Sequence, residues 1–159
     1  MKTATIKELK DELQHKSPSE LKELCLNLGR FKKENKELLT YLLFEAHNEE
    51  AFIDKVKSQI SDSFSEINTK NYYYIRKSVR KILSQTKKFI RYSKKKDTQV
   101  QLLLHFCSEL KEMDPDYRKS NRLRNVFLTQ LNLIEKTIDT LHPDLQYDYF
   151  IELENLNAE

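Results

Sequence analysis

Glycine is nearly absent from this chain. A single glycine, Gly29, occurs among 159 residues, whereas average usage of about 7% would give roughly eleven. Glycine-rich phosphate loops of the G-x-G-x-x-G and G-x-x-x-x-G-K types need several glycines, so the sequence excludes both. Hairpin-rich β folds also rely on glycine in their tight turns. The shortage of glycine therefore predicts a helical protein without a glycine-rich nucleotide site.

A secretory signal and long apolar runs are missing as well. The first twenty residues contain no apolar core of a signal peptide, and no apolar run approaches the roughly 18 residues of a membrane span. The two cysteines, Cys25 and Cys107, lie in amphipathic segments without metal-ligand spacing. This placement is typical of buried, reduced thiols. We therefore expect a cytoplasmic protein that does not associate with membranes.

Apolar side chains recur at spacings of three and four residues along almost the whole chain, as in amphipathic helices. Ser17, Pro18 and Glu20 form a helix start signal. Gly29 is the expected stop of that helix. We predict an all-α fold of seven to eight antiparallel helices, in a bundle or irregular α-hairpin array, as a single domain over residues 1–159. The predicted helices lie near residues 5–14, 17–28, 34–47, 49–67, 71–95, 98–113, 116–141 and 144–156.

Charge is strongly segregated along the chain, although the formal net charge is only +3. Residues 70–96 contain 11 Lys or Arg and no acid, so this segment carries a charge of +11. Residues 97–159 contain 6 basic and 12 acidic residues, and no base follows Lys136. The sequence thus predicts a basic helix near 71–95 and an acidic C-terminal helix near 144–156.

The predicted basic helix carries its cations on one side. At about 100° per residue, its apolar residues fall within an arc of about 120° and its basic residues within about 140° on the opposite side. Like charges four residues apart repel one another in an isolated helix, so this side needs an anionic partner or tolerance from tertiary packing. The nine residues of this basic stripe are the candidate polyanion-binding residues Arg76, Lys77, Arg80, Lys81, Lys87, Lys88, Arg91, Lys94 and Lys95.

Three interpretations of the basic stripe are open. It is a solvated cationic face, it is neutralised by the acidic segment 139–159, or it binds an external polyanion, with nucleic acid as the first candidate. Tyr72, Tyr73, Tyr74 and Tyr92 lie at the two ends of the stripe. They either stack on unpaired bases or anchor the helix ends by packing.

Motifs for catalysis or metal binding are incomplete. The only candidates are two half-motifs, Glu12-x-x-His15 and Asp139-x-x-His142. A carboxylate-bridged di-metal bundle would need two E-x-x-H pairs and two further glutamates. No nucleophile lies at a recognisable spacing from a base. We therefore expect a protein that is not an enzyme and that holds no metal and no cofactor.

Residues 17–42 resemble the two-helix SAP module of nucleic-acid-binding proteins. The segments SPSELKELCLNLG at 17–29 and KELLTYL at 36–42 are similar to its pattern of L-K-x-L, then Gly, then K-x-x-L-x-x-x-L. The spacing after Gly29 is shorter than in the module, Arg30 stands at a usually apolar position, and the module's second glycine is missing. The resemblance implies two packed helices and nucleic-acid binding.

The N-terminal third also resembles an uncharacterised family of small bacterial helical proteins. Those proteins open with an L-x-x-x-L helix, followed by S-x-x-E-L and then a K-E-x-L segment. The corresponding residues here are Leu9 and Leu13, then the segment 17–21, then Lys36-Glu37-Leu38. The resemblance implies a bacterial, cytoplasmic, all-α protein and carries no activity with it.

The sequence as a whole predicts a non-catalytic helical module that binds another macromolecule or acts as a scaffold. The alternative is binding of the RNA or DNA backbone through the basic stripe of residues 70–96. The expected partners are accordingly a protein, a nucleic-acid backbone or a second copy of the chain, and not a membrane.

Overall fold

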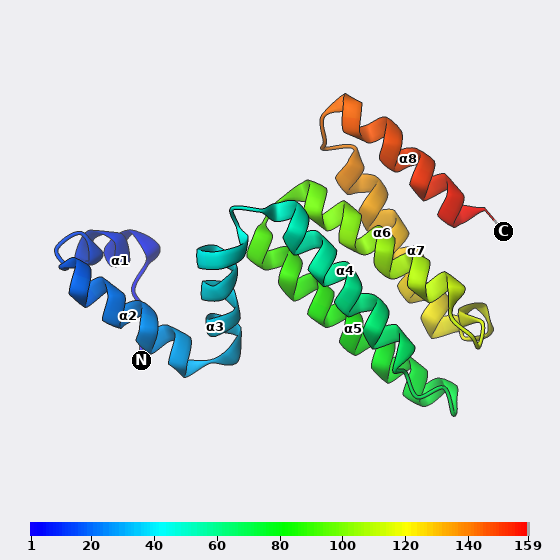
Figure 1. Ribbon diagram of the computed structural model, residues 1–159, viewed down its shortest axis with the longest axis horizontal. Coiled ribbons are helices and arrows are strands. Elements are labelled where there is room, and N and C mark those ends of the chain that lie inside the picture. The colour runs from blue at the N-terminus through cyan, green and yellow to red at the C-terminus, as the bar shows by residue number, and fades with distance from the viewer. Residues whose placement is uncertain (159) are drawn as a thin grey trace. The chain divides into compact units, whose positions relative to one another are not determined.

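The computed structural model describes residues 1–158, which contain eight α-helices and no β-strand (Figure 1). This confirms the predicted all-α fold class. A π-helical segment, Tyr41–Glu45, follows α3, and a 3-10 turn, Tyr117–Lys119, precedes α7. The α-helices are α1 (Ile6–Leu13), α2 (Pro18–Phe31), α3 (Lys33–Thr40), α4 (Glu49–Ser65), α5 (Tyr72–Ser93), α6 (Lys96–Glu112), α7 (Asn121–Ile138) and α8 (Pro143–Asn157).

Side-chain caps begin most of these helices. Ser17 and Glu20 form the predicted capping box of α2, in which the Ser17 amide donates to Glu20 Oε2 over 2.9 Å. Asn48 caps α4 by accepting from the Ala51 amide over 3.2 Å. Each cap gives a partner to backbone N–H groups that the first helical turn leaves free, so these short polar signals fix where the helices begin.

Two predicted helix boundaries are wrong. Gly29 does not stop α2, which continues to Phe31. A Cβ atom at Gly29 would lie 3.0 Å from Leu39 Cδ1, so the Leu39 side chain of α3 packs directly on this glycine of α2. The helix predicted from residue 116 begins only at Asn121, because the Asp116 carboxylate accepts from the Arg118 amide over 2.8 Å and holds the preceding residues in a 3-10 turn.

By contacts the chain divides into two compact units, one formed by Met1–Phe44 and the other beginning at Glu45. The first unit contains α1, α2 and α3, and none of the residues of these three helices is buried. Leu42 and Leu43, which the spacing places on an inward face, are 55% and 67% exposed. The single domain over residues 1–159 stays a prediction.

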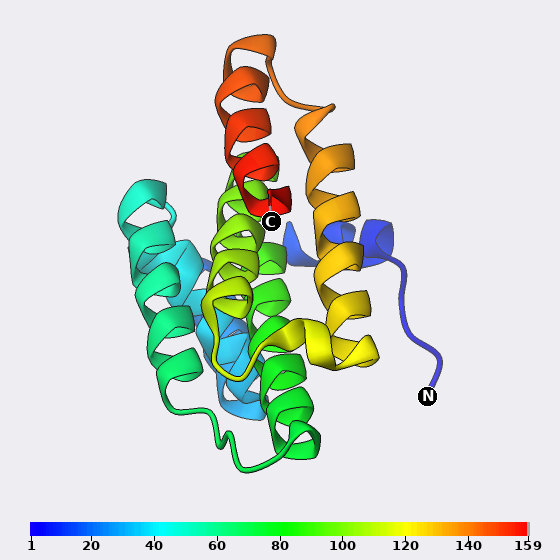
Figure 2. The same cartoon turned by 90° about the vertical axis from the view of Figure 1, so that its right-hand side faces the viewer.

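The second unit is built around α6. This helix packs against α4, α5, α7 and α8 (Figures 1 and 2). Because it has neighbours on several sides, its apolar residues are buried all round, as in the core helix of a larger protein. Its fully buried residues are Val100, Leu102, Leu103, Phe106, Cys107 and Leu110.

Candidate functional site

The basic stripe lies on α5, the longest helix of the second unit. Asn71 begins this helix by accepting from the Tyr74 amide over 3.1 Å. Lys94 ends it in the left-handed region at φ 61°, and its amide donates to the Ile90 carbonyl over 2.9 Å. The opposite side of α5 packs on α4 and α6 through the buried residues Ile75, Val79, Ile82, Thr86 and Ile90. Packing therefore fixes which side of α5 carries the cations outward.

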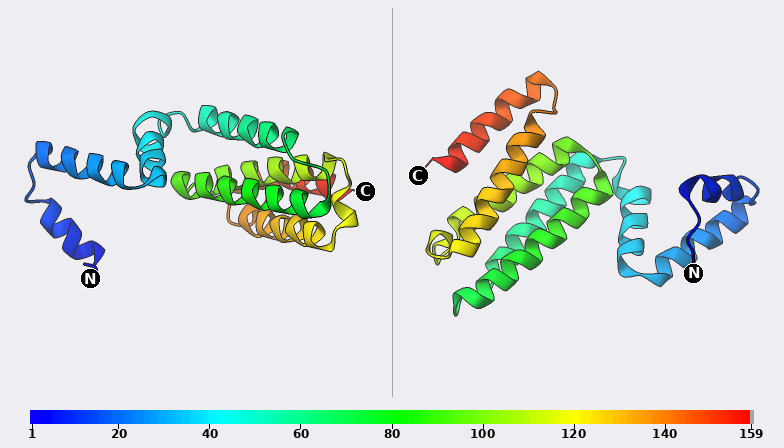
Figure 3. Two further views of the ribbon diagram at one scale, coloured as in Figure 1. Left: turned by 90° about the horizontal axis from the view of Figure 1, so that it is seen from below. Right: turned by 180° about the vertical axis from the view of Figure 1, so that it is seen from behind.

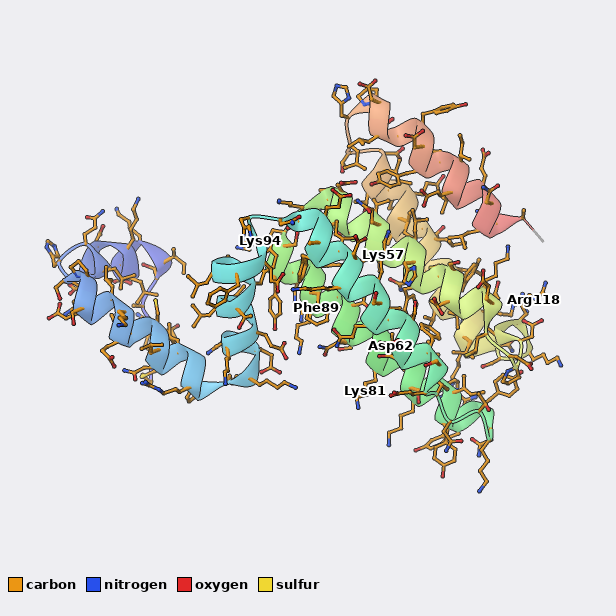
Figure 4. The ribbon with its side chains drawn as sticks, in the orientation of Figure 1. Lys57, Asp62, Lys81, Phe89, Lys94 and Arg118 are labelled. Carbon is orange, nitrogen blue, oxygen red and sulfur yellow. The ribbon has the colours of Figure 1, made fainter. Side chains whose placement is uncertain are left out.

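The structure places all nine stripe residues on or directly after α5, on the side away from this core. Three of them, Arg76, Lys87 and Lys88, are half-buried. Figure 4 labels Lys81 on the helix and Lys94 at its C-terminal end. The exposed members of the stripe are Lys77, Arg80, Lys81, Arg91, Lys94 and Lys95.

Lys95 of the stripe has a carboxylate partner in the second unit. Its Nζ lies 3.5 Å from Glu49 Oε2, and the Glu49 side chain is only 15% exposed. The same carboxylate accepts hydrogen bonds from the hydroxyls of Ser93 and Thr98, the latter over 2.7 Å. Glu49 therefore partly neutralises the Lys95 charge.

Seven other cations of the stripe have no such partner. Within residues 1–158, no carboxylate oxygen lies within 4.0 Å of their charged nitrogens. A row of like charges on one helix raises the local positive potential when no carboxylate lies within ion-pair distance. These seven residues, the unpaired set, are Arg76, Lys77, Arg80, Lys81, Lys87, Arg91 and Lys94.

The acidic C-terminal helix does not lie against α5. It packs on α6 and α7, whereas α5 packs on α4 and α6. In the right panel of Figure 3, α8 and α5 lie on opposite sides of the helices between them. The interpretation in which α8 neutralises the stripe of its own unit is therefore wrong.

The four tyrosines at the ends of the stripe fall into two pairs. Tyr73 and Tyr74 are 61% and 42% exposed, and their ring centroids lie 5.4 Å apart in an edge-to-face arrangement. Tyr72 donates from its hydroxyl to the Asp116 carbonyl over 2.9 Å, and Tyr92 is buried. Packing therefore explains Tyr72 and Tyr92, while Tyr73 and Tyr74 present aromatic surface at the N-terminal end of α5.

A polar cluster between α4 and α6 was not found by motif analysis. Ser61 Oγ lies 2.8 Å from His105 Nε2 and donates to Glu109 Oε1 over 2.7 Å. Burial lowers the pKa of His105, whereas the charge of Glu109 opposes this shift. His105 and Glu109 stand four residues apart, which is a visible signal in the sequence, but Ser61 comes from another helix.

This cluster does not have the geometry of a nucleophile with an oriented base. In a catalytic triad the imidazole lies between the hydroxyl and the carboxylate, with one ring nitrogen toward each. Here Glu109 contacts the Ser61 hydroxyl itself, and it lies 3.6 Å from the same His105 nitrogen that faces Ser61. The arrangement is a set of hydrogen bonds that ties α4 to α6.

The two cysteines and His142 are further candidate reactive or ligating side chains. Cys107 is fully buried, as predicted, and burial raises the pKa of its thiol to about 12, which disfavours the reactive thiolate. The same prediction is wrong for Cys25, which is exposed on α2 because nothing in its own unit covers it. His142 caps α8 by accepting from the Asp144 amide over 3.3 Å.

Within residues 1–158, no group of three or more His, Cys, Asp or Glu side chains is placed to hold a metal ion. In the same residues no helix combines the length and apolar character needed to cross a bilayer.

Comparisons of the chain with protein-family models, with curated proteins and with solved structures find no match.

Proposed function

We propose that the chain is a non-catalytic, cytoplasmic helical module that binds another macromolecule, and that its basic stripe binds the phosphate backbone of RNA or DNA. The observation that carries this proposal is the unpaired set on α5, seven cations without a carboxylate within ion-pair distance in residues 1–158. Phosphate groups would relieve the repulsion among these charges, and the release of counterions from the nucleic acid would favour binding.

The dimensions of α5 suit a phosphate backbone. Its 22 residues span about 33 Å at 1.5 Å per residue, which is about ten steps of 3.4 Å along one strand of duplex DNA. Lysine and arginine contacts to phosphate carry no sequence information, so binding would be largely independent of sequence. Tyr73 and Tyr74, exposed at one end of the stripe, would stack on unpaired bases and favour single strands there.

The experiment is a titration of labelled single- and double-stranded RNA and DNA at several salt concentrations. If about five cations meet phosphates, log K falls against log salt with a slope of about −4.5 for duplex DNA and about −3.5 for single strands. Replacing Arg80, Lys81 and Arg91 by Gln should weaken binding and flatten the duplex slope by up to about 2.7. All three side chains are exposed and belong to the unpaired set, so the fold should tolerate the change.

A variant with the same loss of charge on another helix is the matched control. Arg122, Arg124 and Lys136 are exposed on α7, and their replacement by Gln changes the net charge by the same amount. This variant should keep most of the affinity and the slope. Equal weakening in both variants would show that affinity depends on net charge and not on the stripe. The absence of binding at low salt would refute the nucleic-acid proposal.

A further inference from the structure

The first unit presents a groove between α2 and α3 whose shape is fixed by two contacts. The Leu39 side chain of α3 packs on Gly29 of α2, where an added Cβ atom would lie 3.0 Å from Leu39 Cδ1. Asn35 Nδ2 donates to the Leu28 carbonyl over 2.8 Å, so the start of α3 is tied to the end of α2. Both contacts join α2 to α3 where the two helices meet, so they hold the groove in a defined shape.

The groove has an apolar floor and a basic rim. It encloses about 650 Å³, and its apolar side chains include Leu43 and Phe44, which are 67% and 66% exposed. Arg30 lies 4.0 Å from Glu23, and Lys33 lies 3.9 Å from Glu37. Ion pairs at the protein surface are weak, so both cations can still attract an acidic partner. The cations of the rim are Arg30, Lys32, Lys33 and Lys36.

The basic rim restricts what can cover the apolar floor. Two copies of this groove placed face to face would bring their cations together, and like charges across an interface oppose association. An occupant that carries apolar side chains flanked by carboxylates would cover the floor and pair with the rim. The charge of the groove therefore selects an acidic amphipathic helix.

The chain itself contains a helix of this kind. α8 has no Lys or Arg between residues 143 and 157. On its outer side Tyr147 and Ile151 are 70% and 41% exposed, and they stand four residues apart, on one face. Asp148 and Glu154 lie three residues from Ile151 and Asp144 three from Tyr147, so carboxylates border this apolar pair on both sides.

We propose that the outer face of α8 from a second copy of the chain occupies the α2–α3 groove. The contact joins two different surfaces, so each chain has one groove and one α8 to offer. Such head-to-tail contacts build a ring where the rotation closes and an open chain where it does not. This inference is independent of nucleic-acid binding, because neither surface includes the basic stripe.

Sedimentation of the full chain over a range of concentrations tests the proposal. The wild-type mass should rise with concentration above that of a single chain. Leu43→Asp places a charge on the apolar floor, and Tyr147→Asp places one on the outer face of α8, so each variant should stay a monomer. Both positions are exposed, so these variants should fold, which circular dichroism checks. An equimolar mixture of the two retains one intact groove and one intact α8, so it should associate and stop at a dimer.

Two controls separate this arrangement from others. Leu128→Asp adds the same charge at an exposed leucine of α7 and should associate as the wild type does. The Gln variant at Arg80, Lys81 and Arg91 should also associate, whereas its failure would place α8 on the basic stripe and overturn the proposal. The proposal would also be overturned if the wild type stayed a monomer at every concentration. Self-association of the Tyr147→Asp variant without any other chain would overturn it too.

Discussion

Lys95 Nζ and Glu49 Oε2 lie 3.5 Å apart at the point where three helices meet. Glu49 is the first residue of α4, and its carboxylate also accepts from Ser93 at the end of α5 and from Thr98 near the start of α6. One largely buried carboxylate thus joins the ends of three helices and draws one cation out of the basic stripe. It also lies in the first turn of α4, where the helix dipole favours negative charge.

Replacing Glu49 by Gln should destabilise the protein by about 1–3 kcal/mol. Ser93 and Thr98 both donate to Glu49 Oε1, whereas Oε2 faces Lys95. The neutral amide would lose the ion pair with Lys95 and weaken both hydrogen bonds, because its oxygen carries no charge. Urea unfolding measures the effect. Glu50→Gln is the control, because Glu50 is an exposed acid in the same helical turn and its loss removes the same charge. Equal losses in the two variants would contradict the role of Glu49.

The pH dependence of stability should show a contribution from His105. Burial is the main cause that lowers the pKa of His105 from 6.5, and the charge of Lys57 acts in the same direction. The charges of Glu109 and Glu112 and a hydrogen bond with the Lys57 backbone oppose the shift. Between the folded and the unfolded pKa the unfolded chain binds more protons, so stability rises with pH there. Stability should therefore fall as pH drops below about 6.5, and the loss should be complete below the folded pKa.

His105→Gln tests this contribution, because glutamine retains hydrogen bonding but does not titrate. The unfolding free energy of wild type and variant should be compared at neutral pH and at pH values below the unfolded pKa of His105. The difference between the two proteins should shrink as pH falls, since only the wild type pays for protonating the imidazole. A difference that stays constant over this range would refute the assignment.

The sequence predicted the features of this fold that depend on near neighbours. The capping box of Ser17 and Glu20 and the cap of Asn48 each involve residues three positions apart, so the signal and the contact coincide. The stripe was predicted as a set for the same reason, because one helix fixes the relative directions of its own side chains.

Burial and pairing could not be predicted in the same way. A helical wheel assigns one apolar face to α6, yet Leu102 and Phe106 are buried outside that face, because α6 has neighbours on several sides. The converse holds for Leu43, which lies on an apolar face that no other part of its own unit covers. Periodicity reports which side of a helix is apolar and not what packs against it.

The same limit applies to the candidate site. The pairing of Lys95 with Glu49 removes one of nine predicted cations, and the two residues lie far apart in the sequence. Ser61 contacts His105 from another helix, so no spacing along the chain could reveal that hydrogen bond. Contacts between distant segments follow from the packing of α4, α5 and α6, which composition and periodicity do not determine.

Lys111 should determine how firmly the end of α8 is held. This residue of α6 donates from Nζ to the carbonyl oxygens of Asn155, Leu156 and Ala158, over 3.2, 2.9 and 2.5 Å. These carbonyls belong to the last turn of α8 and the residue after it, where the chain lacks intrahelical donors and the helix dipole attracts a cation. Lys111→Met preserves much of the apolar stem and removes the charge and all three hydrogen bonds.

Hydrogen exchange should show the consequence locally. In Lys111→Met the amides of the last turn of α8 should exchange faster, while amides in the centre of α6 keep their protection. The loss in overall stability should be small, about 0.5–1.5 kcal/mol, because water can replace donors to exposed carbonyls. Lys111→Arg retains a cation with several donors and should protect the last turn as the wild type does. Unchanged exchange in the methionine variant would show that packing on α6 and α7 alone holds the helix end.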